Sequence, residues 1–125
     1  MNDPIRVGVI GAGAISQVAH LPVLRRLPGV EVAAICDNDV GKAQALGTRF
    51  DVKDTYDDIE EVLRYANVDV VVICTPNHLH EIHVTSALSA GAHVLCERPL
   101  AMNLAGVERV LAASDKNGKR VMVGM

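Results

Sequence analysis

The first residues able to do recognisable chemistry are the glycines of the segment VGVIGAGAIS. Gly11, Gly13 and Ser16 follow an apolar run and precede a helical pattern, which gives the spacing G-x-G-x-x-S. The first glycine would permit a tight turn and the second would let a pyrophosphate approach the backbone, where the N–H groups of Ala14 and Ile15 would point at it. Ser16 is small enough for the close helix–strand contact expected at the third position. Taken alone, the pattern also fits an ordinary tight turn between a strand and a helix.

An acidic residue at the end of the next apolar run favours a dinucleotide site. Asp37 closes the segment AAICD, about twenty residues beyond the glycine turn, where its carboxylate can accept hydrogen bonds from both hydroxyls of an adenosine ribose. Neither Asn38 nor Asp39 is basic, and Asp37 would repel a 2′-phosphate, so the sequence favours NAD over NADP. The alternative is a carboxylate that only closes a strand or a turn.

A third polar cluster lies in the segment CTPNHLHEIH. Pro76 fixes a turn, Thr75 and Asn77 offer short polar groups, and a helix that begins near His78 would present free N–H donors. Ligands of open α/β sheets bind at the carboxyl ends of the strands. We therefore expect this segment to face the same ligand as the glycine turn.

The histidines of this cluster also raise the possibility of a metal site. His80 and His83 are three residues apart, with His78 close by, but no carboxylate or cysteine completes an evident set of ligands nearby in sequence. We therefore predict no metal site. The alternatives are a solvent-facing helix start for His78 and a helix-surface or core-edge position for His83.

The segment LCERPL places two opposite charges and a proline where an apolar run should stop. Glu97, Arg98 and Pro99 follow one another directly after that run. The simplest interpretation of the residue types is a structural ion pair that closes the strand.

The elements that must position these residues follow from the hydrophobic pattern. Short β-branched runs predict strands at residues 5–10, 30–36, 68–74, 92–97 and 120–125, with a weaker candidate at 51–55. Helical periodicity predicts helices at residues 14–27, 40–50, 57–66, 78–90 and 104–117. Apolar runs without strict alternation are typical of a parallel sheet covered on both faces. Right-handed crossovers would wind this series into an α/β, doubly wound Rossmann sheet of order 3-2-1-4-5-6.

Composition excludes several other classes of protein. The chain has 125 residues, half of them hydrophobic, and a formal net charge of −3, which suits one domain with its own core and gives no basic surface for nucleic acid or a membrane. Its apolar segments are short and its first residues show no secretory pattern, so we expect a cytoplasmic protein. Cys36, Cys74 and Cys96 each close an apolar run, which favours free buried thiols over a disulfide framework. Cys74 and Cys96, expected on adjacent strands, could approach each other.

Five segments, in this order, resemble the N-terminal domain of the glucose-fructose oxidoreductase, inositol dehydrogenase and rhizopine-catabolism (Gfo/Idh/MocA) family: GAGAIS, CDND, TPNHLH, AGAHVLCERPLA and VMVGM. The resemblance covers essentially the whole chain and implies an NAD(P)-binding Rossmann domain. It implies that the glycine turn holds the pyrophosphate, that Asp37 holds the adenosine ribose, and that Glu97 lies near the nicotinamide ribose. It places four further residues along the nicotinamide half of the cofactor: Thr75, Pro76, Asn77 and His80. The reactions it implies are hydride transfers at a carbon of a sugar, cyclitol or related polyol.

The chain departs from the family at Arg98. Family members carry Glu-Lys-Pro where this chain has Glu97-Arg98-Pro99, and the resemblance implies that the lysine positions the substrate hydroxyl and assists proton transfer. Because a guanidinium keeps its proton, Arg98 could orient and stabilise an alkoxide but would be a poor proton shuttle. The resemblance also implies a cis peptide bond before Pro99. This corner therefore predicts a binding site with altered chemistry, with Arg98 as the candidate catalytic residue.

The resemblance also bears on domain organisation. Family enzymes continue into a C-terminal domain that builds the substrate pocket and supplies a catalytic histidine, and nothing in residues 1–125 corresponds to it. We expect this chain to be the cofactor domain alone, cut from a longer protein or encoded by a truncated gene, and unable to complete catalysis without substrate positioning. Apolar surface left uncovered would favour a homo-oligomer.

Two alternatives to an oxidoreductase domain remain open. One is a non-catalytic NAD(P)-binding regulatory or sensor module, which Arg98 and the missing domain favour. The other is a fold whose turns bind another nucleotide or nothing.

Overall fold

The computed structural model describes residues 3–124 and shows a parallel sheet of six strands in the order β3-β2-β1-β4-β5-β6. The strands are β1 (Ile5–Ile10), β2 (Val30–Cys36), β3 (Thr55–Tyr56), β4 (Val70–Ile73), β5 (His93–Glu97) and β6 (Val121–Gly124). The predicted fold class and strand order are confirmed. Because the order reverses between β1 and β4, the turns after these two strands leave the sheet in opposite directions and frame a ligand crevice.

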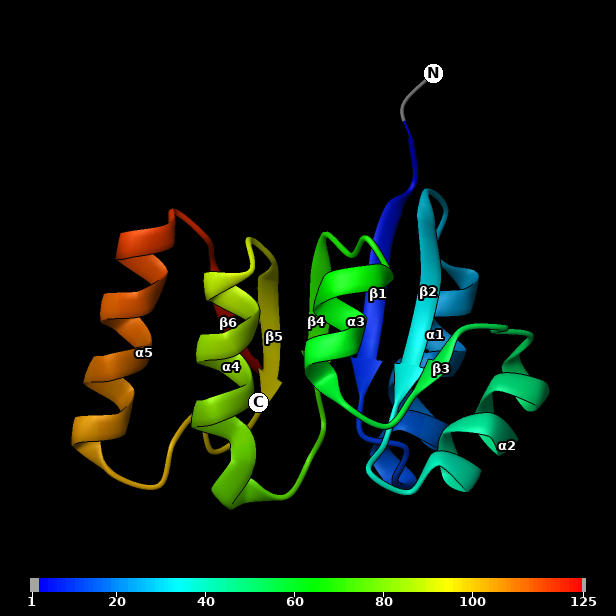
Figure 1. The fold of residues 1–125 in the computed structure, drawn as a ribbon, viewed down its shortest axis with the longest axis horizontal. Helices are drawn as coiled ribbons and strands as arrows, with labels where there is room; N and C mark the ends of the chain where they lie inside the picture. The colour runs from blue at the N-terminus through cyan, green and yellow to red at the C-terminus, as the bar shows by residue number, and fades with distance from the viewer. Residues whose placement is uncertain (1–2, 125) are drawn as a thin grey trace.

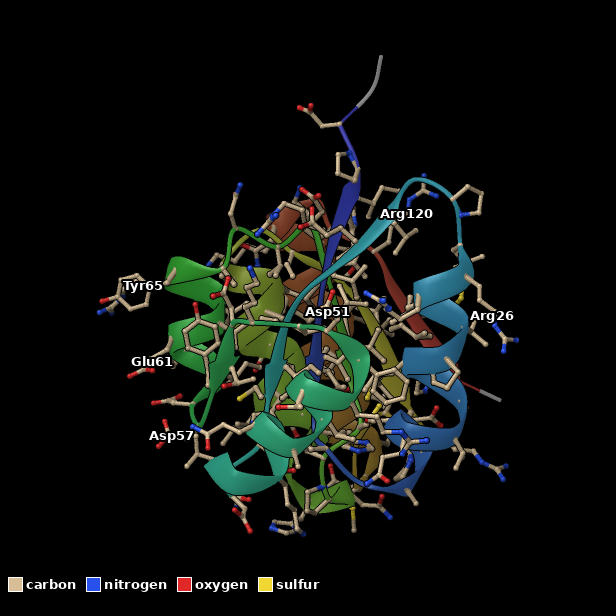
Figure 2. The ribbon with its side chains drawn as sticks, turned by 90° about the vertical axis from the view of Figure 1, so that its right-hand side faces the viewer. Arg26, Asp51, Asp57, Glu61, Tyr65 and Arg120 are labelled. Carbon is tan, nitrogen blue, oxygen red and sulfur yellow. The ribbon has the colours of Figure 1, made fainter. Side chains whose placement is uncertain are left out.

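Helices cover both faces of this sheet, as Figures 1 and 2 show. They are a π-helical segment η1 (Ser16–His20), α1 (Leu21–Arg26), α2 (Val40–Phe50), α3 (Ile59–Tyr65), a short 3₁₀ turn η2 (Asn77–Leu79), α4 (His80–Ser89) and α5 (Leu104–Asn117). Seen edge-on in Figure 2, α3 with Tyr65 lies on one side of the strands and α1 with Arg26 lies on the other. The sheet is therefore the middle of three layers.

Each face of the sheet has its own hydrophobic core. The larger core packs α3, α4 and α5 against the sheet, with Val62, Val84 and Val110 fully buried. The smaller core packs α1 and α2 against β1 and β2 through Leu21 and Leu46. These cores consist mostly of Val, Ile, Leu and Ala, so the strand ends are held by close aliphatic packing.

The third strand differs from its prediction. The sequence predicts it at residues 51–55, but β3 is Thr55–Tyr56 and pairs only with the end of β2. The reason is the end of α2, where Asp51 adopts a left-handed conformation and the Val52 N–H donates to the Gly47 carbonyl. Residues 51–54 are thus used to stop the helix and return the chain to the sheet.

One part of the sheet remains open to solvent. A shallow apolar depression over β4, β5 and β6 is lined by Val70, Leu95 and Met122 among others, and Met122 is 69% exposed. The expected uncovered apolar surface is therefore present, and the self-association inferred from it stays a prediction. Within residues 3–124, no helix combines the length and apolar character that crossing a membrane requires.

Candidate functional site

A cleft of about 440 Å³ lies where β1, β2 and β4 end. Five residues predicted to bind a cofactor line it: Gly11, Gly13, Asp37, Thr75 and Pro76. They come from three separate turns, and the parallel sheet brings these turns together because its strands end at one edge.

The glycine turn is shaped by its contact with β4. Gly11 has a φ of +105°, and a Cβ atom there would lie 2.5 Å from the Cys74 carbonyl oxygen, so only glycine fits. Its N–H donates to the Cys36 carbonyl at 2.7 Å. Gly13 differs, because a Cβ atom there would meet nothing within 4 Å. The fold itself would accommodate a side chain at this position, so the glycine serves only to keep the cleft open.

The start of the first helix is partly exposed and partly buried. Ala14 and Ile15 lie on the surface at the beginning of the helical segment, beside Gly13. Ser16 is fully buried and its hydroxyl donates to the Gly11 carbonyl. The expected role of Ser16 as a small residue at a close helix–strand contact is confirmed.

Asp37 has a fixed orientation in the cleft. Its Oδ2 accepts from the Ala12 N–H at 2.8 Å, and its Oδ1 accepts from the Asp39 N–H at 2.9 Å. A carboxylate oxygen can accept two hydrogen bonds, so each oxygen keeps capacity for a ligand hydroxyl. Asp37 therefore joins the end of β2 to the glycine turn and also faces the cleft.

Sequence reasoning missed Lys42, which lines the cleft together with Asp37 and Asn38. It lies in the first turn of α2, whose N-cap is Asp39. Lys42 also lines a second groove with Gly13, Ala14 and Arg49. The two residues directly after Asp37 are not basic, but the first turn of α2 brings a later, basic residue to the same edge. The helix N-cap signal at Asp39 could have revealed it.

Thr75 is held by a histidine that also lines the cleft. Its hydroxyl lies 2.9 Å from Nδ1 of His83. Burial, and then the charge of His80, lower the pKa of His83, so its ring is neutral at neutral pH. The structure thus gives His83 a position at the core edge and a contact with the site.

His80 is buried beneath the cleft and is 1% exposed. Its Nδ1 lies 2.6 Å from the Pro99 carbonyl oxygen, and its Nε2 lies 2.7 Å from the Thr75 carbonyl oxygen. Both ring nitrogens are therefore engaged by the backbone. A direct contact between His80 and a cofactor stays a prediction, whereas its contact with two site turns is observed.

Glu97 and Arg98 do not form the ion pair considered from their sequence. Glu97 Oε1 lies 2.6 Å from His20 Nε2, in a partly buried pair that joins β5 to η1. Arg98 is exposed and the Arg98–Pro99 peptide bond is cis, as the resemblance implied. His20 is the second residue that sequence reasoning missed, and no local pattern marks it because its partner lies 77 positions away.

The remaining residues of the TPNH segment lie at the surface. Asn77 and His78 are exposed in η2 and do not line the cleft. In the described part of the chain, no group of three or more metal-ligating side chains is placed to hold a metal ion.

The cysteines are free thiols, as predicted. Burial is the main cause that raises the pKa of Cys36 and Cys96 to about 12 and that of Cys74 to about 11. These groups stay protonated at neutral pH and act as small apolar side chains.

The fold and this cleft define a dinucleotide-binding domain of the Rossmann class. Residues 5–125 match the family model described as an oxidoreductase family with an NAD-binding Rossmann fold, GFO_IDH_MocA. The chain therefore belongs to the Gfo/Idh/MocA oxidoreductase family and corresponds to its NAD-binding domain.

Several relatives are similar over nearly the whole chain. The chain is 35% identical to D-glucoside 3-dehydrogenase of Escherichia coli and 36% identical to inositol 2-dehydrogenase of Salmonella typhimurium; each match covers 94% of this chain. The matches cover 34% and 35% of those proteins, so the chain spans about a third of their length.

Solved structures agree in fold. KijD10, a 3-ketoreductase from Actinomadura kijaniata in complex with NADP and TDP-benzene, superposes with a TM-score of 0.91 at 34% identity over 98% of this chain and 37% of its own. Scyllo-inositol dehydrogenase from Lactobacillus casei with NAD(H) and scyllo-inositol superposes with a TM-score of 0.90 at 20% identity over 98% of this chain and 36% of its own, a likeness of fold alone.

Proposed function

We propose that this chain binds NAD in the cleft at the ends of β1, β2 and β4. The observation that carries the proposal is the orientation of Asp37, whose carboxylate is fixed by the Ala12 N–H within the same cleft that Gly13 leaves open. In this proposal Asp37 holds the adenosine ribose, and the backbone from Gly11 to Ile15 faces the pyrophosphate. Thr75, Pro76, Asn77 and Glu97 face the nicotinamide half.

The activity of the whole protein is proposed to be hydride transfer to or from a carbon of a sugar, cyclitol or related polyol. The family match and relatives such as D-glucoside 3-dehydrogenase and inositol 2-dehydrogenase support this reaction class. About two thirds of the length of each relative lies outside the region that these residues match, and we propose that this remainder builds the substrate pocket. Residues 1–125 are then proposed to bind cofactor without completing catalysis.

Arg98 is proposed as the residue of this chain nearest the reacting carbon. Its exposure beyond β5 leaves the guanidinium available to a substrate oxygen. Because it keeps its proton, it would orient the substrate and stabilise negative charge on oxygen, and another group would have to move the proton. If no such group is supplied, the same cleft serves a regulatory module that binds NAD without turnover. Assaying NAD reduction with polyols in a protein that also carries the second domain separates these functions.

The preference for NAD depends on two opposing charges. Asp37 disfavours a 2′-phosphate by like-charge repulsion, whereas Lys42 in the same cleft would attract one. We propose that Asp37 dominates because its carboxylate is fixed by two backbone N–H groups while Lys42 is exposed on a flexible stem. Replacing Lys42 by Gln is then expected to weaken NADPH binding further and to leave NADH binding unchanged.

A fluorescence titration of the purified chain with NADH and NADPH tests the proposal, and the absence of tryptophan keeps the protein background low. Asp37→Ala is expected to weaken NADH binding about tenfold, which corresponds to about 1.4 kcal/mol. The matched control is Asp54→Ala, since Asp54 is exposed and does not line the cleft. Equal NADH affinity in Asp37→Ala and the parent chain, or no saturable binding at all, would reject the assignment of this cleft.

A further inference from the structure

His80 connects two turns that belong to different strands. Its Nε2 contacts the carbonyl of Thr75, just after β4, and its Nδ1 contacts the carbonyl of Pro99, just after β5. The ring is 1% exposed, so water does not compete for either nitrogen. Since both turns lie at the carboxyl edge of the sheet, the position of His80 sets the spacing between them.

The two partners of His80 determine its protonation state. A backbone carbonyl oxygen accepts hydrogen bonds and cannot donate, whereas a neutral imidazole carries hydrogen on only one of its nitrogens. A neutral ring would therefore press one nitrogen lone pair against a carbonyl lone pair at 2.6 or 2.7 Å. Only a ring with hydrogen on both nitrogens satisfies both contacts.

The lengths of the two contacts also favour a ring with hydrogen on both nitrogens. Uncharged N–H···O hydrogen bonds centre at about 2.9–3.0 Å, and those from charged donors at about 2.7–2.9 Å. The contacts of His80 measure 2.6 and 2.7 Å, so one is at the short end of the charged class and the other is just below it. Two carbonyl dipoles facing one cation also replace part of the hydration that burial removes.

We propose that His80 is a positioning residue that is doubly protonated in the folded chain and clamps the Thr75–Pro76 turn to the Arg98–Pro99 turn. Its importance for the nicotinamide half rests on the proposed function above, whereas its protonation and its clamping of the turns do not. His80 is buried and does not line the cleft, so in this proposal it acts on a ligand through the two turns, in place of the direct cofactor contact that the resemblance implies.

The charged and titratable groups around His80 are consistent with this state. Glu97 and Arg98 precede Pro99, and Glu97 is engaged by His20. Glu81, next to His80 in α4, is engaged by Arg109 of α5, and Cys74, which precedes Thr75, is a protonated thiol. His83 lies one turn along α4, and burial and then His80 lower its pKa. Its ring therefore stays neutral and does not repel a positive charge on His80.

Long-range ¹H–¹⁵N correlation spectra of the histidine rings test the protonation state directly. In the labelled chain at neutral pH, with His80 assigned through its backbone, both of its ring nitrogens are expected in the protonated class with N–H protons that exchange slowly. The exposed His78 provides the reference, with N–H protons averaged with water. One protonated and one unprotonated nitrogen in His80 would overturn the proposal. This experiment needs no variant and no ligand.

Backbone ¹⁵N relaxation of the ligand-free chain tests the clamping. His80→Gln cannot donate from two opposite ring positions, so the amides of both turns are expected to become more mobile together: Thr75, Asn77 and His78 in the first, and Arg98 and Leu100 in the second. The matched control is His83→Gln, because the ring of His83 contacts the Thr75 hydroxyl and forms no hydrogen bond with Pro99. Mobility that rises in one turn only, or equally in both variants, would overturn the role assigned to His80.

NADH titration then connects the clamp to the site. With His80→Gln we expect about a tenfold weaker affinity, and with His78→Gln a change of less than about twofold. Unchanged affinity in a folded His80→Gln chain would contradict a positioning role for the cofactor. If the parent chain itself fails to bind NADH, the proposed function falls, while the ring spectra and the relaxation data still decide the state and the clamping role of His80.

Discussion

The two sides of the carboxyl edge of the sheet are built by different means. On the glycine side, at the ends of β1 and β2, backbone groups and one carboxylate make the shape, and Gly11 lies against the Cys74 carbonyl with no room for a side chain. On the histidine side, at the ends of β4 and β5, His80, His83 and His20 hold the turns through side chains that come from helices. The glycine side therefore depends on volume and backbone conformation, and the histidine side depends on the protonation and charge of side chains.

The largest expected effect tests the steric side. Gly11→Ala combines a φ of +105° with a Cβ atom 2.5 Å from the Cys74 carbonyl oxygen, so β1 and β4 would have to separate. We expect it to lower the free energy of unfolding by about 3 kcal/mol or more. Urea denaturation of the chain and the variant measures the difference.

The control for Gly11 is Gly29→Ala. Gly29 also has a positive φ, +74°, but a Cβ atom there meets nothing within 4 Å. We expect Gly29→Ala to lower the free energy of unfolding by only about 1 kcal/mol, which is the cost of the conformational strain. Similar losses in the two variants would show that the contact with Cys74 is not what the glycine side depends on.

A smaller effect is expected from the pair of His20 and Glu97 on the histidine side. His20 and Glu97 contact each other at 2.6 Å with side chains 18% and 27% exposed. A double-mutant cycle with His20→Ala and Glu97→Gln should give a coupling free energy of about 1 kcal/mol, since a partly exposed pair is screened by solvent. Stability measured by urea denaturation for the four chains supplies the cycle. If the two single substitutions change the free energy of unfolding in a strictly additive way, this pair does not hold β5 to η1.

The smallest effect concerns the neutral histidine. Burial, and then His80, lower the pKa of His83 in the folded chain below its unfolded value, so the unfolded chain binds more protons as the pH falls. The stability contributed by His83 is therefore complete above its unfolded pKa and is lost on acidification below it.

This pH dependence is measurable as a difference between two chains. Between about pH 7.5 and about pH 5.5 the parent chain should lose more stability than His83→Gln, which has no ring to protonate. Denaturation at the two pH values provides the comparison. A larger loss in His83→Gln would reverse the sign and contradict a buried neutral ring.

The predictable part of the site is the part encoded by local spacing. Gly11, Gly13 and Asp37 were identifiable because a strand, a glycine turn and an acidic strand end recur at a fixed distance in sequence, and the structure places all of them in one cleft. Lys42 is equally local, but it lies in the first turn of α2, beyond the two residues that directly follow Asp37, so the strand-end pattern does not reveal it. The start of β3 was also misplaced, since the left-handed stop at Asp51 competes with the strand pattern.

Sequence patterns are sufficient to predict the alternation of strands and helices, the strand order and the edge of the sheet where a ligand would lie. These follow from hydrophobic periodicity and handed crossovers, which depend on neighbouring residues and on general chain geometry. Tertiary packing alone brings His80 to the Thr75 and Pro99 carbonyls and Glu97 to His20. Such contacts form between residues far apart along the chain, and a side chain's partner and protonation depend on which buried acceptors the packing brings to it.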